Sequence, residues 1–151
     1  MGVDSAREPA GDCLAKANEE AVECTDCPFC RISRGELPAQ VVYSDEAALA
    51  FLDAHPQAPW HVLVIPRQHV EGLDRLEEAT AAGRPGKDGS GQQAQQTAGH
   101  LLWVAARVAR QLGLDEKGYR LVINTGPQAG QTIRHLHLHV LGGRAMRWPP
   151  G

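Results

Sequence analysis

In Arg134-His-Leu-His-Leu-His-Val-Leu-Gly-Gly143, a histidine stands at every second position and an aliphatic residue lies between neighbouring histidines. Successive side chains of a β-strand point to opposite faces of the sheet, so this alternation predicts a half-buried strand. One face would be aliphatic and buried, and the other would carry three imidazoles into the same space. A purely structural role is the alternative, but imidazole suits nucleophilic attack, proton transfer and metal ligation near neutral pH. We therefore expect a functional site at this strand.

The rest of the chain predicts more short strands and one long helix. Strands are expected at residues 40–43, 47–53, 61–65, 119–124 and 136–141, and several are joined by turns too tight for parallel crossovers. Residues 92–112 carry an apolar stripe at helical spacing, and residues 73–82 predict a further helical stretch. The expected class is α+β: a five-stranded antiparallel sheet with one long helix and a short helix.

Length and charge limit what the chain can do. The 151 residues suit a single domain, which we place at residues 23–151, after a disordered tail at residues 1–22 and with a flexible Gly-rich insertion at about 83–91. Residues 1–26 hold seven of the 18 acidic residues but only two of the 15 basic ones, so the remainder is slightly basic. That excess is too small to indicate nucleic-acid binding, but it suits a small anionic ligand.

The sequence shows no targeting or membrane segment. No apolar run approaches the roughly 18 residues that a membrane span needs. The N-terminus lacks the basic and apolar regions of a secretory signal. We therefore expect a cytoplasmic protein with no membrane partner.

The four cysteines, Cys13, Cys24, Cys27 and Cys30, all lie in the first fifth of the chain. In a secreted protein they could form two disulfides, whereas in a reducing compartment Cys27-Pro-Phe-Cys30 is typical of metal ligands or a redox pair. A redox pair is expected where a helix begins after a strand, but the residues after Cys30 predict only a short helical turn stopped by Gly35. The spacing therefore favours zinc, with histidines from elsewhere completing a tetrahedral set.

Taken together, these motifs resemble the histidine triad (HIT) family of nucleotide hydrolases and transferases. The resemblance runs from about Cys27 to Gly151, apart from the Gly-rich insertion. Its motifs are His135-Leu-His-Leu-His-Val-Leu141, Phe51-Leu-Asp53, Pro56-Gln-Ala-Pro59, His61-Val-Leu-Val-Ile-Pro66, His69, Gly118-Tyr-Arg120, Asn124, Gly130-Gln131 and Leu141-Gly-Gly-Arg144. The final Trp148-Pro-Pro-Gly151 is similar to the Hint branch, the purine nucleoside phosphoramidases. The family fold implies a homodimer in which two sheets become one continuous surface.

The resemblance implies a reaction at an α-phosphorus. His137 would be the nucleophile and form a covalent nucleotidyl-histidine intermediate, which water then hydrolyses. His139 would donate a hydrogen bond to a phosphate oxygen as charge builds there. Thr132, where Hint proteins usually show Ser, would act near the leaving group, and His61 matches a catalytic or structural histidine beside the triad. The phosphate would be held through an amide, a backbone N–H and a hydroxyl, supplied by Asn124, Gly130 and Thr132.

The expected substrate is a purine nucleoside 5′-phosphoramidate, such as an adenosine conjugate, or a related acyl-adenylate, and the product is AMP. Asp53 would accept hydrogen bonds from the ribose hydroxyls. Phe29, Ile32 and Leu37 match the apolar walls around the base, although Ile32 and Leu37 could equally be core residues. Leu52 stands where Hint relatives often have His, which leaves the base preference open.

Many HIT proteins carry Cys-x-x-Cys before the first strand and hold zinc with two thiolates and two histidines. Cys27, Cys30, His69 and His135 match that set, which implies a closed structural zinc site. Cys24 could compete as a ligand. No organic cofactor is expected.

Two other functions stay open. One is another activity of the same family, a dinucleoside polyphosphate hydrolase or phosphorylase. The other is a zinc-stabilised nucleotide-binding scaffold protein whose catalysis is incidental. Metal-dependent hydrolysis with the triad as an open zinc site is less favoured, since it needs a metal at the nucleophile.

Overall fold

The structure, a computed structural model, describes residues 26–81 and 90–150. The expected tail at residues 1–22, most of the insertion at 83–91, and Cys13 and Cys24 lie outside these ranges. Within them, no helix is both long enough and apolar enough to cross a membrane.

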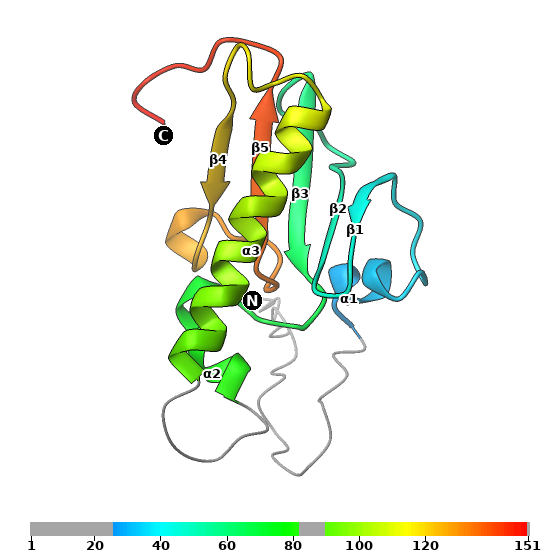
Figure 1. Cartoon of the computed structure of the whole chain (residues 1–151), viewed down its shortest axis with the longest axis vertical. Coiled ribbons are helices and arrows are strands. Elements are labelled where there is room, and N and C mark those ends of the chain that lie inside the picture. Colours follow the sequence, from blue (N-terminus) through cyan, green and yellow to red (C-terminus); the bar gives the residue numbers. More distant parts are fainter. Residues whose placement is uncertain (1–25, 82–89, 151) are drawn as a thin grey trace, which may run out of the picture.

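Five strands form one sheet in which every neighbouring pair is antiparallel (Figure 1). The spatial order is β1-β2-β3-β5-β4, so β3 is the central strand and has β2 and β5 as its neighbours. The strands are β1 (Val41–Ser44), β2 (Ala48–Leu52), β3 (Trp60–Pro66), β4 (Arg120–Ile123) and β5 (Leu138–Gly142).

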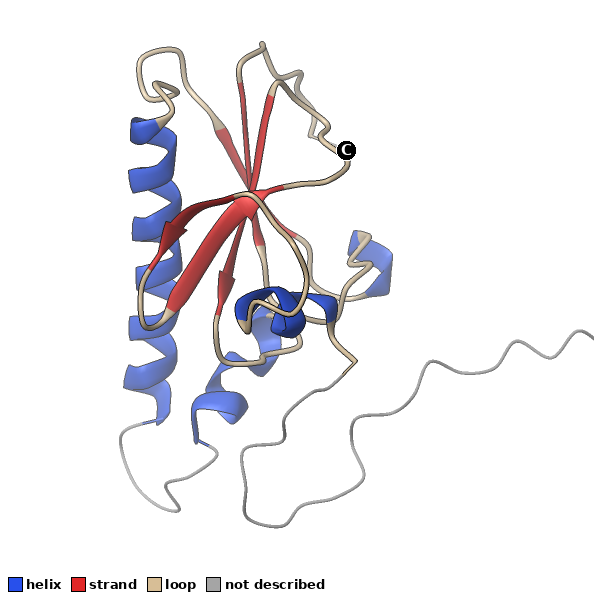
Figure 2. Ribbon diagram, turned by 90° about the vertical axis from the view of Figure 1, so that its right-hand side faces the viewer, coloured by secondary structure: helices blue, strands red, loops and turns tan. Residues whose placement is uncertain are grey.

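The helices lie on both sides of the sheet. The long helix α3 (Ser90–Gln111) runs along one face, and α1 (Pro28–Ser33) lies on the other side (Figure 2). The remaining helical segments are η1 (Leu73–Arg75), α2 (Leu76–Ala81), which packs against α3, and η2 (Pro127–Ala129) after β4. The α+β class, the antiparallel sheet and the long helix predicted from the sequence are confirmed.

Alternation along β2, β3 and β5 divides the core into two layers. Even-numbered residues of the three strands pack with Leu101, Val104, Ala105 and Val108 of α3: Ala48, Ala50, Val62, Val64, Leu138 and Val140. Leu49, Phe51, Leu63 and Ile65 point to the opposite face and pack with Cys27, Phe29 and Cys30 of the α1 segment. Because β2 and β3 are covered on both faces, their sequences are almost continuously apolar rather than alternating.

The histidine-rich strand is shorter than predicted. β5 begins at Leu138, because the preceding residues leave the ladder and the N–H of Leu136 donates to the carbonyl of Val70 at 2.6 Å. The side-chain alternation nevertheless continues, since Leu136, Leu138 and Val140 are all buried in the layer beneath α3. Of the three histidines, only His139 belongs to the strand, where it is paired with Leu63 of β3.

Candidate functional site

The face of the sheet opposite α3 carries a cleft of about 1140 Å³ beside α1. Of the residues predicted from the resemblance, seven line it: Phe29, Ile32, Asp53, His61, Thr132, His137 and His139. Leu37, Asn124 and Gly130 do not line it, and the N–H of Gly130 donates within its own loop to the carbonyl of Pro127 at 3.1 Å. The fold therefore brings the histidines, the acid, the hydroxyl and two apolar side chains into one space.

His137 lines the cleft, and a backbone contact fixes the tautomer of its ring. Its Nδ1 lies 2.6 Å from the backbone oxygen of His135, and a carbonyl oxygen can only accept, so Nδ1 carries the proton and donates it. In the neutral ring, Nε2 then keeps its lone pair. The ring is buried, with Phe29 packed edge-on at a centroid distance of 5.2 Å and His139 at 4.9 Å. The backbone bond thus leaves a nucleophilic nitrogen at a fixed place.

A series of hydrogen bonds through His61 determines which nitrogen of His139 carries the proton. The N–H of Gln57 donates to Nδ1 of His61 at 3.1 Å, so a neutral His61 carries its proton on Nε2. That nitrogen lies 2.8 Å from Nδ1 of His139, which must accept. His139 therefore carries its proton on Nε2, and among the described residues this is the buried side-chain nitrogen that lacks a hydrogen-bond partner. It is a donor prepared for a group that enters the cleft.

The protonation states agree with this chain. The pKa of His139 is lowered to about 4, first by burial and then by the neighbouring His137 and His61, against the opposing effect of the Asp53 carboxylate. Burial also lowers the pKa of His61, against the opposing effect of Asp53. Both rings are therefore neutral near pH 7, as the donor and acceptor assignments require.

Asp53 directly follows β2 and lines the cleft. Its Oδ1 accepts the N–H of His55 at 2.8 Å, and its Oδ2 lies 3.3 Å from Nε2 of His61. The side chain is about one-fifth exposed, so one face of the carboxylate can still accept hydrogen bonds from a ligand.

A second cluster lies behind the cleft and joins α1 to the histidine-rich segment. The Sγ atom of Cys30 lies 3.3 Å from Nδ1 of His69 and 3.5 Å from Nδ1 of His135, and Cys27 Sγ is 3.4 Å from the same His135 nitrogen. The four ligand atoms all lie within 4.8 Å of one another. Two thiols and two imidazoles at such separations are the donor set of a closed tetrahedral zinc site.

The surroundings of His135 fit a metal ligand. Its Nε2 lies 2.9 Å from the carbonyl oxygen of Pro66 and so donates its proton there, which leaves the Nδ1 lone pair facing the thiols. Histidine ligands usually donate their other nitrogen to a carbonyl or carboxylate in this way. Burial lowers the pKa of His135 to about 4 and also lowers that of His69, so both rings are neutral and able to ligate.

Asp53, His61 and His139 also bring their ligand atoms within 4.8 Å of one another. However, Nδ1 of His61 accepts the N–H of Gln57, so its Nε2 carries the proton and offers no lone pair. His135 is the opposite case, because its outer nitrogen donates to a carbonyl and its other nitrogen keeps a lone pair for a metal. The three residues therefore form a hydrogen-bond chain rather than a second metal site.

Phe29 connects the two clusters. Its ring lies between those of His135 and His137, at centroid distances of 5.8 and 5.2 Å. Cys27 and Cys30 flank it, so a metal that orders this segment also orders the wall against which His137 packs.

Several residues of the cleft were not identified from the sequence. Phe51 and Leu63 lie on β2 and β3, whereas the others lie in loops that carry no periodic pattern. Gln57 contributes through its backbone, which no side-chain motif reveals. Those that line the cleft are Pro38, Ala39, Gln40, Phe51, His55, Gln57, Leu63 and Ile133.

Comparisons with known proteins agree with this geometry. The HIT domain profile matches residues 34–146 of the chain. An uncharacterized HIT-like protein of Synechococcus elongatus is 50% identical over 126 residues, which cover 83% of this chain and 97% of that protein. The 14 kDa zinc-binding protein of Zea mays is 46% identical over 123 residues, with 82% and 86% of the two chains covered. Among solved structures, a HIT family hydrolase from Legionella pneumophila has a TM-score of 0.70 and 42% identity, over 83% of this chain and all of that one.

Proposed function

The chain belongs to the HIT domain family, and we propose that it is a hydrolase that cleaves the P–N bond of purine nucleoside 5′-phosphoramidates, or a related acyl-adenylate, and releases AMP. The observation that carries this proposal is the fixed tautomer of His137. Its Nδ1 proton is held by a backbone carbonyl, so in the neutral ring the lone pair lies on Nε2, which can act as a nucleophile in the cleft.

The reaction proceeds in two steps. Nε2 of His137 attacks the α-phosphorus, a P–N bond to the ring forms, and the bond to the substrate amine breaks as that amine takes up a proton from the solvent. Water then attacks the nucleotidyl-histidine: its oxygen stays on phosphorus, one of its protons passes to the solvent, the ring nitrogen recovers its lone pair, and AMP leaves. Dividing the reaction in this way replaces one high barrier with two lower ones.

His139 and its neighbours stabilise the negative charge that builds on the phosphate oxygens. The buried Nε2–H of His139 has no partner of its own in the described part of the chain, so a phosphate oxygen can take that place without breaking an existing bond. His61 keeps this proton on the correct nitrogen. Thr132 lines the same cleft and offers a hydroxyl toward the leaving group.

The nucleoside occupies the apolar end of the cleft. Asp53 accepts hydrogen bonds from the ribose hydroxyls, and Phe29 and Ile32 contact the base. Ile32 also packs against the core layer that contains Phe51, so it serves both the core and the cleft. Roles in nucleotide binding for Leu37, Asn124 and Gly130 stay predictions from the resemblance.

Zinc and a partner subunit complete the proposal. Zinc bound by Cys27, Cys30, His69 and His135 would stabilise the fold rather than take part in the reaction, because all four positions are filled by protein. Cys27 and Cys30 form no disulfide, which suits a reducing, cytoplasmic location. The homodimer would use the edge strand β4, which leaves one side of its backbone available for pairing.

The experiment is to trap the intermediate. The protein is mixed with a slowly hydrolysed adenosine 5′-phosphoramidate, quenched in alkali and analysed by mass spectrometry. We expect one AMP adduct on His137, none in His137→Asn, and an unchanged adduct in His100→Asn, which removes a histidine from α3. If diadenosine tetraphosphate is instead turned over and the phosphoramidate is not, the P–N specificity is wrong.

A further inference from the structure

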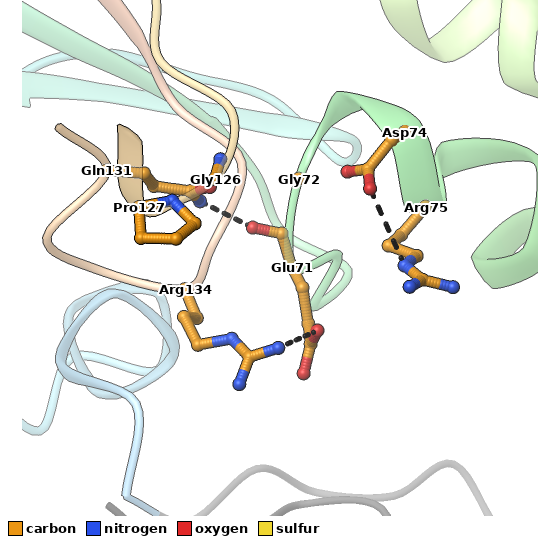
Figure 3. A pocket seen from close by; sticks show the side chains of 8 residues that line it. All are labelled: Glu71, Gly72, Asp74, Arg75, Gly126, Pro127, Gln131 and Arg134. Carbon is orange, nitrogen blue, oxygen red and sulfur yellow. Dashed lines mark hydrogen bonds and ion pairs between the residues drawn. The ribbon is translucent and has the colours of Figure 1, made fainter. Parts of the chain in front are cut away.

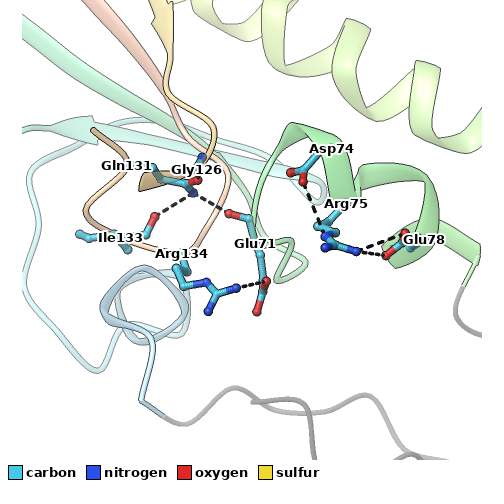
Figure 4. Close-up of polar contacts among 8 residues, drawn as sticks. All are labelled: Glu71, Asp74, Arg75, Glu78, Gly126, Gln131, Ile133 and Arg134. Atoms are coloured by element: carbon cyan, nitrogen blue, oxygen red, sulfur yellow. Dashed lines mark hydrogen bonds and ion pairs between the residues drawn. The ribbon is translucent and has the colours of Figure 1, made fainter. Parts of the chain in front are cut away.

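The side chain of Gln131 joins three separate points of the backbone (Figure 3, Figure 4). Its Oε1 accepts the N–H of Gly126 at 2.9 Å. Its Nε2 donates to the carbonyl of Glu71 at 2.6 Å and to that of Ile133 at 3.0 Å. Both N–H groups and the oxygen of this carboxamide are therefore used, and none of the three partners is a side chain that could move aside.

Each of the three points belongs to a different part of the site. Gly126 begins the loop that contains η2 and leads to Thr132, which lines the cleft. Ile133 also lines the cleft and lies on the segment that leads to His137. Glu71 follows the metal-site residue His69 by two positions. One carboxamide thus connects the loop, the nucleophile's segment and the segment after β3.

The surrounding structure allows this close approach. A Cβ atom on Gly72 would lie 3.5 Å from Oε1 of Gln131 and 3.4 Å from the side chain of Thr125, so the segment after β3 lies directly against the loop. The N–H of Leu136 also donates to the carbonyl of Val70, which adds a bond between the segment after β3 and the segment that carries His137. These bonds therefore hold the loop after Gly126 and the segment after β3 in a fixed relative position.

Gln131 also borders a groove, but the charges of that groove do not indicate a site for an ionic ligand. It has a volume of about 410 Å³, and its charged side chains are paired with one another. Arg134 binds Glu71 at 2.9 Å, and Arg75 lies 3.6 Å from Asp74 and 3.1 Å from Glu78. Its arginines are thus already engaged by carboxylates, so the groove offers no unopposed charge to an ionic ligand.

We propose that Gln131 is a positioning residue: its carboxamide holds the loop before Thr132 against the segments that carry His69 and His137, and so keeps the phosphate-contacting groups aligned with the nucleophile. This inference rests on the proposed nucleotide hydrolysis. Gln131 does not line the cleft and acts only through the backbone that it holds. A displacement of about 1 Å in such groups can cost roughly 100-fold in rate.

The test is Gln131→Glu, which keeps the size and the acceptor for Gly126 but replaces the NH₂ group with an oxygen. That oxygen would face the carbonyls of Glu71 and Ile133, neither of which can donate. We expect kcat to fall roughly 10- to 100-fold with little change in KM, since alignment matters most in the transition state. The matched control is Gln128→Glu, the same charge change on an exposed residue of the same loop, which leaves kcat and KM at wild-type values.

A pH profile separates positioning from mere folding. As the pH falls, the introduced carboxyl group becomes protonated and can donate again, so the ratio of variant to wild-type kcat rises. The charged groups close to the introduced carboxyl group are the Glu71–Arg134 pair and Asp74. A group that titrates in both wild type and variant changes both kcat values alike and leaves their ratio unchanged. Gln131→Met, which removes all three bonds without adding a charge, lowers kcat with no recovery at low pH.

These rates are measured at a temperature where circular dichroism shows each variant to be folded. If Gln131→Glu and Gln131→Met lower only the melting temperature and keep wild-type kcat, Gln131 does not position the site and the inference is wrong. Failure of the wild-type protein to form the His137 adduct would instead refute the proposed function on which the inference rests.

Discussion

Nε2 of His61 lies 2.8 Å from Nδ1 of His139, and the backbone N–H of Gln57 decides which of these two nitrogens carries the proton. Because Gln57 occupies the far nitrogen of His61, the proton between the rings belongs to His61. The consequence appears on the other side of His139, where Nε2–H is left as an unpartnered donor among the described residues. A main-chain N–H, which no side-chain motif specifies, thus determines the chemistry of the third triad histidine.

Replacing His61 should therefore disturb His139 rather than the nucleophile. In His61→Phe, the Nδ1 atom of His139 loses its donor, so the ring is no longer fixed in the Nε2–H tautomer. We expect kcat to fall roughly 10- to 100-fold, less than or comparable to the ~10²–10³ that loss of a whole oxyanion donor costs. ¹⁵N NMR of the histidine side chains should show the change of tautomer. If the His139 signals were unchanged, the proposed series of hydrogen bonds from Gln57 through His61 to His139 would be wrong. His100→Phe serves as the control.

Removal of zinc should destabilise the protein, although none of the zinc ligands takes part in the proposed reaction. With free zinc at about 1,000 times its Kd, binding adds about 4 kcal/mol to the free energy of unfolding. For a domain of this size, that corresponds to roughly 10 °C in Tm. Cys30→Ser should lose both the metal and this increment, whereas Cys13→Ser should retain them. Metal analysis by mass spectrometry and thermal unfolding provide the check, and a Cys30→Ser protein with a full zinc content would exclude the assigned ligands.

Stability should fall as the pH drops below neutrality. The pKa of His139 is lowered, mainly by burial, from 6.5 to about 4. Between pH 6.5 and 4, the ring is therefore protonated in the unfolded chain but stays neutral in the folded protein. Its contribution is complete above about pH 6.5 and is lost as the pH falls toward 4. Urea unfolding of wild type at pH 7.5 and 5 should show this decrease, with a smaller decrease in His139→Gln. Equal decreases in both proteins would show that His139 is not the group responsible.

The aliphatic side of the histidine segment should matter for folding alone. Leu138 is 1% exposed in the layer beneath α3, so Leu138→Ala leaves a cavity and should cost about 2–5 kcal/mol of unfolding free energy. Leu73→Ala is the matched control, because Leu73 is 44% exposed and its change should stay within about 0.5 kcal/mol. Urea unfolding measures both. Similar values for the two variants would mean that β5 does not pack as described.

The alternation of residues 135–140 was sufficient to predict which side chains face the core. Leu136, Leu138 and Val140 are buried beneath α3 as expected, because side-chain direction in an extended segment follows local backbone geometry. The same pattern did not predict that the ladder starts only at Leu138. That boundary depends on a bond between Leu136 and Val70, two residues that are far apart in the chain.

The three histidines do not share one space as their pattern alone suggested. His135 turns toward Cys27 and Cys30, whereas His137 and His139 line the cleft, and Phe29 lies between the two groups. The resemblance to a zinc-binding set had already assigned His135 to the metal. Why it separates from its neighbours is visible only where α1 packs against the sheet.

By itself, the sequence determined the chemical types available at the site, the alternating burial of its strands and the helix that covers one face, because these follow from side-chain identity and local periodicity. Only the tertiary structure decided which nitrogen of each imidazole carries its proton. Those choices are made by the carbonyls of His135 and Pro66 and by the N–H of Gln57, backbone atoms that every residue possesses and that no sequence pattern can distinguish.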